Sequence, residues 1–196
     1  MKIYLTDQKN KFKQHLDFLK KKDVMDYDKT GLTEKITTIE INTTKKIDQL
    51  NLDFLFNYQI FPDNIMANKN QWTAEHRTMQ VGDTIVQQVY IPPIKTFSQK
   101  IIFGVRINEI FNHTNKKGFS YETLEGHVEK GISTFTFEQL DNKIIFKIHT
   151  HSTPGNILTK LLGTIFSVPY QTYCTKVALK NVKNQLEKIN HEIINP

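Results

Sequence analysis

A run of β-rich segments followed by one long amphipathic stretch constrains most strongly what this chain can fold into. The segments "DTIVQQVYI", "QKIIFGVRINEI", "GFSYETLEGHVEKG" with "ISTFTFEQL", and "KIIFKIHTH" are rich in β-branched and aromatic residues and are separated by turn residues. After Pro154, apolar residues recur instead with a helical period. A sheet with one apolar face needs a cover, and only the C-terminal helix is long enough to provide it. We therefore predict an α+β fold in which a curved antiparallel sheet of about six to seven strands grips a long C-terminal helix.

The N-terminal half of the chain supplies the remaining predicted elements. The stretch "TDQKNKFKQHLDFLKKK" spaces its apolar residues as one helical stripe, and "EKITTIEIN" is typical of a strand. The pattern of residues 43–61 predicts a second helix, which stops before a proline. Residues 72–80 predict a strand that forms a hairpin with residues 83–91.

The C-terminal helix contains one signal for a break. Because proline removes a backbone donor, Pro169 either kinks one long helix or begins a second one. Apolar residues keep a helical period on both sides of it, at Ile157, Leu158, Leu161, Leu162, Ile165 and Phe166, and then at Tyr170, Tyr173, Val177, Leu186, Ile189 and Ile193.

Composition narrows the possible classes of protein. With 196 residues, of which 38% are hydrophobic, the chain is long enough for one domain with its own core. The net charge of +6 is spread over the sequence without a basic motif interleaved with aromatics, so we expect no nucleic-acid partner. The single cysteine, Cys174, excludes an internal disulfide and gives no zinc pattern. No segment suits a signal peptide or a transmembrane span, so we expect a cytoplasmic protein.

The segment 118–131, "GFSYETLEGHVEKG", gathers side chains that suit acid–base chemistry. In one interpretation His127 transfers protons, and Glu125 or Glu129 sets its tautomer and pKa. In the other, His127 and a nearby glutamate hydrogen-bond the backbone groups of the turn. Neighbours in a turn seldom converge on one reacting atom. The sequence therefore favours the structural role and predicts no catalytic residue.

Four residues outside this segment are considered for binding. Trp72, the only tryptophan, either packs in the core or lines a pocket. Arg106 lies on a strand with two apolar faces, so it is either exposed or buried beside an anionic partner or ligand. His149 and His151 share one face of a strand and are close enough to share a metal ion, but no third ligand is recognisable. Solvent exposure is the favoured interpretation of this pair, and we predict no metal site and no cofactor.

Several of these stretches resemble a known family. "GFSYETLEGHVEKG", with the aromatic pair in "ISTFTF" after it, is similar to the signature GFxYxTLxGHxExGE of a bacterial and plant family known as a domain of unknown function. "YDKTGLT" resembles the opening motif of this family, "HSTPG" the segment after its last strand, and "VPYQTYCTKVALKNV" its closing helix with a glutamine. The glutamate that often follows the last glycine of the signature is replaced here by Ile132.

The resemblance implies the helix-grip fold, which START lipid-transfer domains and polyketide-cyclase-like proteins share. We therefore expect residues 26–196 to form a single helix-grip domain and residues 1–25 to add an N-terminal amphipathic helix. Curvature in such folds often separates the sheet from the helix at one end, so a cavity between them is the expected place of function.

Three hypotheses about function follow from these observations. In the favoured one the protein binds a hydrophobic or amphipathic small molecule between the sheet and the C-terminal helix. In the alternative it is a cyclase- or hydrolase-type enzyme that uses Tyr121, His127 and Glu129. In the third it is a protein-interaction module that binds through its N-terminal helix. The expected ligand-binding residues are Trp72, Arg106, Tyr121, His127 and Glu129.

Overall fold

Long antiparallel strands dominate the fold, and the alternation of side chains along them gives the sheet two different faces. The computed structural model describes residues 2–94, 97–154 and 164–192. Within these residues the strands form one eight-stranded antiparallel sheet in the order β2-β8-β7-β6-β5-β4-β3, and β1 pairs with β5 beside this path. The strands are β1 (Lys2–Tyr4), β2 (Thr33–Ile41), β3 (Met66–Asn70), β4 (Thr84–Ile91), β5 (Gln99–His113), β6 (Lys116–Thr123), β7 (Glu129–Leu140) and β8 (Lys143–Pro154).

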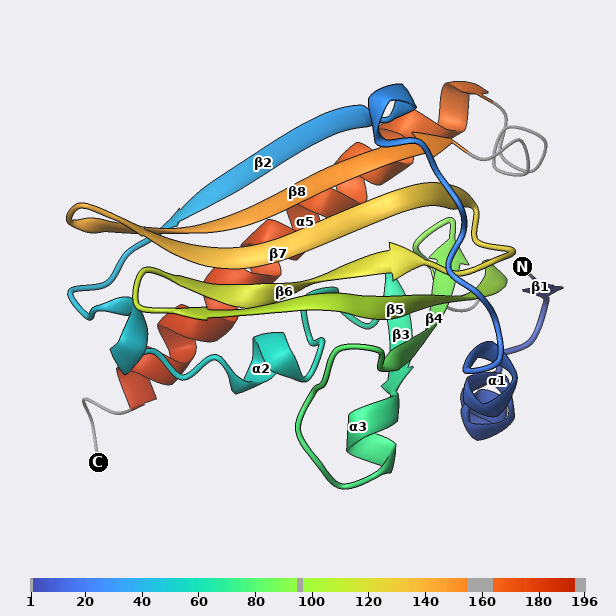
Figure 1. The fold of residues 1–196 in the computed structure, drawn as a ribbon, viewed down its shortest axis with the longest axis horizontal. Helices are drawn as coiled ribbons and strands as arrows, with labels where there is room; N and C mark the ends of the chain where they lie inside the picture. The colour runs from blue at the N-terminus through green and yellow to red at the C-terminus, as the bar shows by residue number, and fades with distance from the viewer. Residues whose placement is uncertain (1, 95–96, 155–163, 193–196) are drawn as a thin grey trace.

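One long helix lies along the inner face of the curved sheet (Figure 1). It is α5 (Thr164–Glu192), and the arrangement confirms the predicted α+β helix-grip fold. Pro169 lies inside α5, so the chain forms one helix here and not two. The apolar stripe predicted at residues 157–162 lies outside the described residues. Within the described part of the chain, no helix combines the length and the apolar character needed to cross a membrane.

The inner face of the sheet carries the main hydrophobic core. Phe119, Phe135, Phe137 and Phe146, from neighbouring strands, are almost fully buried. Tyr58 inserts into this row, with its ring centre 6.1 Å from that of Phe119 and 6.4 Å from that of Phe135. Burial of side chains of this size contributes about 1.5–3 kcal/mol each, so this layer holds the helix on the sheet. α5 adds these buried apolar residues to the same core: Ala178, Leu179, Val182 and Leu186.

The segment between β2 and β3 corrects one prediction. Instead of a long helix over residues 43–61, it forms a 3-10 turn at Ile47–Gln49 and the short helix α2 (Asp53–Phe56). The side chain of Asn51 accepts a hydrogen bond from the N–H of Asp53, which makes a turn that interrupts a continuous helix. After α2, Tyr58 adopts a positive φ of 58°, which a helix does not allow. The apolar spacing that suggested a helix instead buries these side chains in the core: Ile47, Leu50, Leu52, Phe54 and Leu55.

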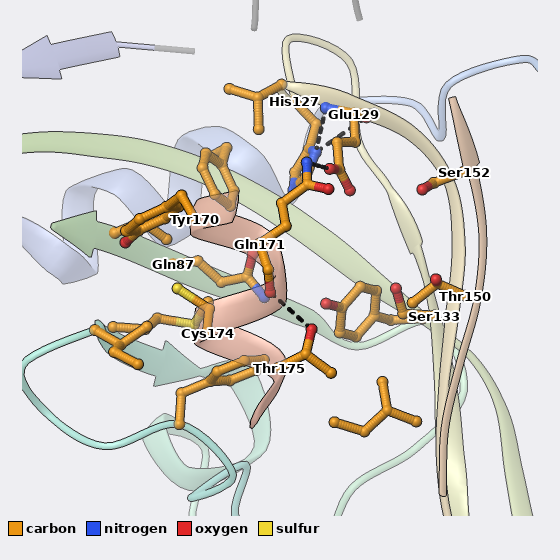
Figure 2. A pocket seen from close by; sticks show the side chains of 18 of the residues that line it. Gln87, His127, Glu129, Ser133, Thr150, Ser152, Tyr170, Gln171, Cys174 and Thr175 are labelled. Carbon is orange, nitrogen blue, oxygen red and sulfur yellow. Dashed lines mark hydrogen bonds between the residues drawn. The ribbon is translucent and has the colours of Figure 1, made fainter. Parts of the chain in front are cut away.

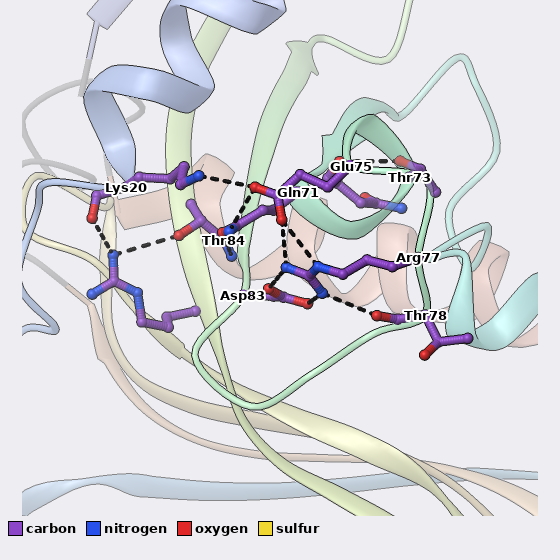
Figure 3. Close-up of polar contacts among 10 residues, drawn as sticks. Lys20, Gln71, Thr73, Glu75, Arg77, Thr78, Asp83 and Thr84 are labelled. Atoms are coloured by element: carbon purple, nitrogen blue, oxygen red, sulfur yellow. Dashed lines mark hydrogen bonds and ion pairs between the residues drawn. The ribbon is translucent and has the colours of Figure 1, made fainter.

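The partner of β4 is a second correction. Residues 72–80, predicted as a strand, lie in the short helix α3 (Gln71–Ala74) and the loop after it, and β4 pairs with β3 instead. The guanidinium of Arg77 fixes this loop, because it binds both carboxylate oxygens of Asp83, at 2.7 and 2.5 Å, and Glu75 at 2.7 Å (Figure 3). These ion pairs, with the positive φ of 53° at His76, hold the segment away from the extended conformation of a strand.

The helix α1 (Phe12–Leu19) covers part of the outer face of the sheet. Its predicted apolar stripe, Phe12, Leu16 and Leu19, is buried against residues of β3, β4 and β5. Gly104 on β5 allows the close approach, because a Cβ atom at this position would lie only 3.0 Å from Cδ1 of Leu19. The stripe that could have served another protein as a docking surface therefore packs within this chain.

Arg106 on β5 binds the C-terminal end of α1. Its Nη2 donates to the backbone oxygens of Lys20, at 3.0 Å, and Leu19, at 3.4 Å, and to Oγ1 of Thr84 at 3.4 Å. The last carbonyls of a helix lack partners within it, so a cation at this end both satisfies them and interacts favourably with the helix dipole. Lys20 adds an ion pair with Glu75 at 3.0 Å, which joins α1 to the loop before β4 (Figure 3).

The role of Arg106 as an anchor predicts the effect of its loss. The substitution Arg106→Met removes these hydrogen bonds and should lower the free energy of unfolding by about 1–2 kcal/mol, measured by urea denaturation. The matched control is Lys143→Met, which removes an exposed ion pair with Glu40 and should cost no more than about 0.5 kcal/mol. Equal stability of the two variants would contradict the anchoring role.

Candidate functional site

A pocket of about 430 Å³ lies between the inner face of the sheet and the first half of α5 (Figure 2). One part of its wall is apolar and comes from β3, β4, β5 and the segment before β3, with Phe61, Ile65, Met66, Val89, Ile91, Ile101 and Phe103. The other part is polar and comes mainly from β2, β7, β8 and α5, with Lys35, His127, Glu129, Ser133, Thr150, Ser152 and Gln171. The pocket is thus amphipathic, with an apolar side and a polar side.

The pocket forms where α5 stands away from the sheet. The second half of the helix is fixed, because its apolar side chains are buried and Asn181 and Gln185 donate to the backbone oxygens of Ile60, at 2.9 Å, and Gln59, at 2.7 Å. Nearer the start of the helix, Tyr170 donates to the backbone oxygen of Tyr90 at 2.6 Å and so spans from the helix to β4. Between these attachments, the side chains that line the pocket are Gln171, Cys174 and Thr175.

Glu129 and Gln171 meet at the polar side of the pocket. The side-chain amide of Gln171 donates to Oε1 of Glu129, which links β7 to α5 (Figure 2). Burial raises the pKa of the Glu129 carboxyl, and the hydrogen bond from Gln171 and the charge of Lys35 act in the opposite direction. A carboxyl with a raised pKa can carry a proton closer to neutral pH than an exposed one, so it can donate as well as accept a hydrogen bond.

His127 makes a structural hydrogen bond beside this carboxyl. Its Nδ1 lies 3.0 Å from both the backbone nitrogen and the backbone oxygen of Glu129, so the ring is held by the main chain of that residue. The ring packs edge-on against Phe103, with ring centres 4.2 Å apart. Burial lowers the pKa of His127 to about 3, and the imidazole is therefore neutral at physiological pH. This contact is the backbone role that the sequence favoured over proton transfer.

Tyr121 places a hydroxyl on the same inner wall. It lies on β6, and its ring is 5.4 Å from Phe135 and 6.1 Å from Tyr58. Burial raises the pKa of the hydroxyl, against the effect of the polar side chains of Tyr58, Ser133 and Gln87 around it. The group is a phenol at neutral pH, and its hydroxyl hydrogen-bonds with the polar side chains of this wall.

Two predicted ligand-binding residues lie away from the pocket. Trp72, in α3, is 1% exposed and belongs to the core, and its Nε1 has no hydrogen-bond partner among the described residues. Arg106 points to the opposite face of the sheet and binds the end of α1. The structure therefore brings Tyr121, His127 and Glu129 together and separates Trp72 and Arg106 from them.

The sequence interpretation missed several polar residues of the pocket. Lys35 comes from β2, Gln87 from β4, and Gln171 from α5, which are far apart in the chain. Only Gln171 carried a usable signal, because it is the glutamine of the stretch that resembles the closing helix of the family. Lys35 looks like an ordinary strand lysine, and only the pairing of β2 with β8 directs it inward, opposite Thr150.

Most residues of the 118–131 segment serve the architecture around the pocket. Gly118 and Gly131 have φ of 152° and 146°, and a Cβ atom at either would lie 2.0 Å from a backbone oxygen of the neighbouring strand. Oγ1 of Thr123 accepts from the N–H of Gly131 at 3.1 Å. Glu122 accepts a hydrogen bond of 2.5 Å from the hydroxyl of Tyr27, in the "YDKTGLT" stretch. These close backbone contacts and hydrogen bonds fix the conformation of the segment and so bring His127 and Glu129 to the pocket.

The fold and the site define a class, namely a helix-grip protein with an amphipathic pocket between sheet and helix. The model of one protein family, described as a domain of unknown function (DUF1990), matches residues 50–180. This match spans more than half of the chain, and the protein belongs to that family. No curated protein matches the chain in sequence.

Two solved structures are similar to this chain at low sequence identity. Hypothetical protein jhp0584 from Helicobacter pylori is 9% identical, with a TM-score of 0.51, and the match covers 84% of this chain and 96% of that one. A major latex-like protein from Panax ginseng is 12% identical, with a TM-score of 0.48 and coverage of 79% and 97%. At such low identity, the similarity to the Helicobacter pylori protein establishes the fold and nothing about function.

The burial of His127 predicts how stability depends on pH. Its folded pKa is about 3 and its ordinary value 6.5, so the unfolded chain takes up the proton first and stability is lost as the pH falls below 6.5. The variant His127→Asn keeps an acceptor near the position of Nδ1 but does not titrate. From pH 7 to pH 5, the free energy of unfolding of the wild type should fall by about 2 kcal/mol more than that of the variant.

Denaturant unfolding at each pH measures this difference. The raised pKa of Glu129 makes its own contribution to stability grow as the pH falls, but this contribution cancels because both proteins retain Glu129. The control is His113→Asn at an exposed position, which should follow the wild type. Parallel pH profiles for the wild type and His127→Asn would contradict a buried, neutral His127.

Proposed function

We propose that this protein binds a hydrophobic or amphipathic small molecule in the pocket between the sheet and α5. The observation that carries the proposal is the pocket itself, with about 430 Å³ of space, an apolar side and a polar side. Known small-molecule pockets have volumes of about 300–1,000 Å³, mostly apolar walls and a few polar groups that fix orientation. The proposed binding domain is residues 26–196, and residues 1–25 add an outer layer that does not line the pocket.

The two sides of the pocket suggest how a ligand would lie. Its apolar body would pack against Val89, Ile101 and Phe103, where burial of about 200 Å² of apolar surface contributes about 5 kcal/mol before the costs of association. Its polar group would lie near Glu129 and Gln171, which offer donors and acceptors. The resemblance to the START and polyketide-cyclase-like superfamily supports the same proposal by analogy of fold alone.

The enzyme hypothesis has less support from the same residues. A general base works best with a pKa near the working pH, whereas burial lowers that of His127 to about 3. Nδ1 of His127 is also occupied by the backbone of Glu129. The interaction-module hypothesis has less support because the apolar stripe of α1 is buried within the chain.

Blocking the pocket tests the proposal. The variant Cys174→Trp places a large ring into the space beside α5, whereas Lys176→Trp adds the same ring on the exposed side of that helix. With 1-anilinonaphthalene-8-sulfonate as a fluorescent probe, the first variant should bind at least about tenfold more weakly than the second, a difference of about 1.4 kcal/mol. Saturated fatty acids should displace the probe, and their binding free energy should become more favourable by up to about 0.8 kcal/mol for each added methylene until the pocket is full. Equal probe binding by the two folded variants would refute the site.

Cys174 provides an independent test, because it is the only cysteine and lines the pocket. Burial raises the pKa of its thiol, so alkylation by iodoacetamide at pH 8 should be slower than that of an unfolded control. A molecule in the pocket should slow this reaction further, in proportion to its occupancy, as followed by mass spectrometry. Alkylation at the same rate with and without saturating probe would show that the probe binds elsewhere.

A further inference from the structure

A cluster of metal-ligating side chains lies on the outer face of the sheet, on the other side from the pocket. His149 and His151 are two residues apart on β8 and therefore point to the same face. Glu34, on the edge strand β2, lies directly opposite His151 in the antiparallel register. The intervening Thr150 lines the pocket, which places the two histidines on the outside. The pairing of strands thus supplies the third ligand that the sequence did not disclose.

The donor atoms of these residues already converge. Oε1 of Glu34 lies 2.7 Å from Nε2 of His149 and 3.5 Å from Nε2 of His151. The imidazole rings lie beside each other, with centres 4.4 Å apart. One ligand atom from each residue lies within 4.8 Å of the other two. Zn²⁺ binds nitrogen and oxygen at about 2.0–2.2 Å, so tetrahedral donors stand about 3.3 Å apart, and small rotations of these side chains would reach that spacing.

We propose that Glu34, His149 and His151 form a binding site for a divalent transition-metal ion, with Zn²⁺ as the cation that the site fits best. Two imidazole nitrogens and one carboxylate oxygen suit Zn²⁺, Ni²⁺ and Cu²⁺, and they do not suit Mg²⁺ or Ca²⁺, which prefer oxygen ligands. Three protein ligands leave a fourth position of a tetrahedral ion open to water or to another ligand.

The surroundings of the cluster favour a cation. Lys147, on the same face of β8, is paired with Glu138 at 2.8 Å, so its charge is compensated by a carboxylate of β7. Glu34 brings a negative charge to the histidines, and its side chain keeps 56% of its surface exposed, which leaves the site open to ions from solution. His149 and His151 keep 25% and 38%, so both rings are held partly by the sheet and partly reachable.

Metal binding at this place would join β2 to β8. β2 is the edge strand of the sheet, and it carries Thr33 and Lys35 into the pocket while it carries Glu34 to the outside. An ion that binds only the folded chain stabilises it, by a free energy that grows with the logarithm of the ion concentration once this exceeds the dissociation constant. A bound ion would therefore hold β2 against β8 and so stabilise the strand that completes the polar side of the pocket.

The experiment is a titration of untagged, chelator-treated protein with ZnCl₂, followed by isothermal titration calorimetry. We expect one Zn²⁺ per chain and no heat of binding with MgCl₂. The variants Glu34→Gln, His149→Gln and His151→Gln should each bind Zn²⁺ at least about tenfold more weakly, because loss of an outer-shell partner alone costs about 10–100-fold. Added Zn²⁺ should raise the thermal unfolding midpoints of these variants less than that of the wild type.

Three control variants separate this site from other possible ligands. Glu40→Gln removes another exposed carboxylate of β2, His113→Gln removes an exposed histidine, and Cys174→Ser removes the only thiol. All three should keep the wild-type affinity and stoichiometry, and circular dichroism confirms that each variant is folded. The proposal is overturned if the wild type binds no stoichiometric Zn²⁺, or if the three ligand variants bind it as the controls do.

Discussion

The attachment of α5 to the sheet through its second half is the constraint on which the rest of this structure depends. Ala178, Val182 and Leu186 are buried in the core that the aromatic residues of the inner face build. Asn181 and Gln185 bind the backbone of the segment before β3, so the helix is held by polar contacts as well as by apolar ones. Because one half of the helix is held in this way, the other half can stand away from the strands without loss of the fold. The pocket is the space that this arrangement leaves.

Alternation along two strands then gives the sheet a different chemistry on each face. On β8, Thr150 and Ser152 line the pocket, whereas His149 and His151 point outward. On β2, Lys35 faces inward and its neighbour Glu34 faces outward. A shift of one residue in the register of β2 against β8 would turn Lys35 outward and Glu34 inward. Both the polar side of the pocket and the third member of the histidine cluster therefore depend on one pairing.

The sequence predicted those elements whose pattern is local and missed those that tertiary contacts decide. The alternation of β4 to β8 and the helical period of α5 lie within single stretches, so the fold class followed from them. The segment 43–61 has helical spacing, but the turn at Asn51 and the burial of its side chains override this preference. Residues 72–80 have strand character, but Arg77 binds Asp83 and fixes a loop.

The same distinction separates the site residues that were predicted from those that were not. Tyr121, His127 and Glu129 lie within one segment, so proximity in the chain already indicated proximity in space. Gln171 and Lys35 reach the pocket only through the docking of α5 and the pairing of β2, and Glu34 meets His151 only through that same pairing. Trp72 and Arg106 have side chains suited to ligand binding, yet Trp72 packs in the core and Arg106 anchors the end of α1.

In the 118–131 segment, residues whose types suit acid–base chemistry mainly stabilise the backbone conformation. The glycines at its two ends, Gly118 and Gly131, occupy positions where a Cβ atom would meet a backbone oxygen, and Thr123 bonds the backbone of Gly131. Its histidine is bonded to the backbone of Glu129, which fixes the ring, and burial lowers the pKa of His127 so that the ring remains neutral. Tyr121 and Glu129, in contrast, bring polar side-chain atoms to the wall of the pocket. A segment built in this way holds two polar groups in place at the wall of an apolar cavity, which is what orientation of an amphipathic ligand requires.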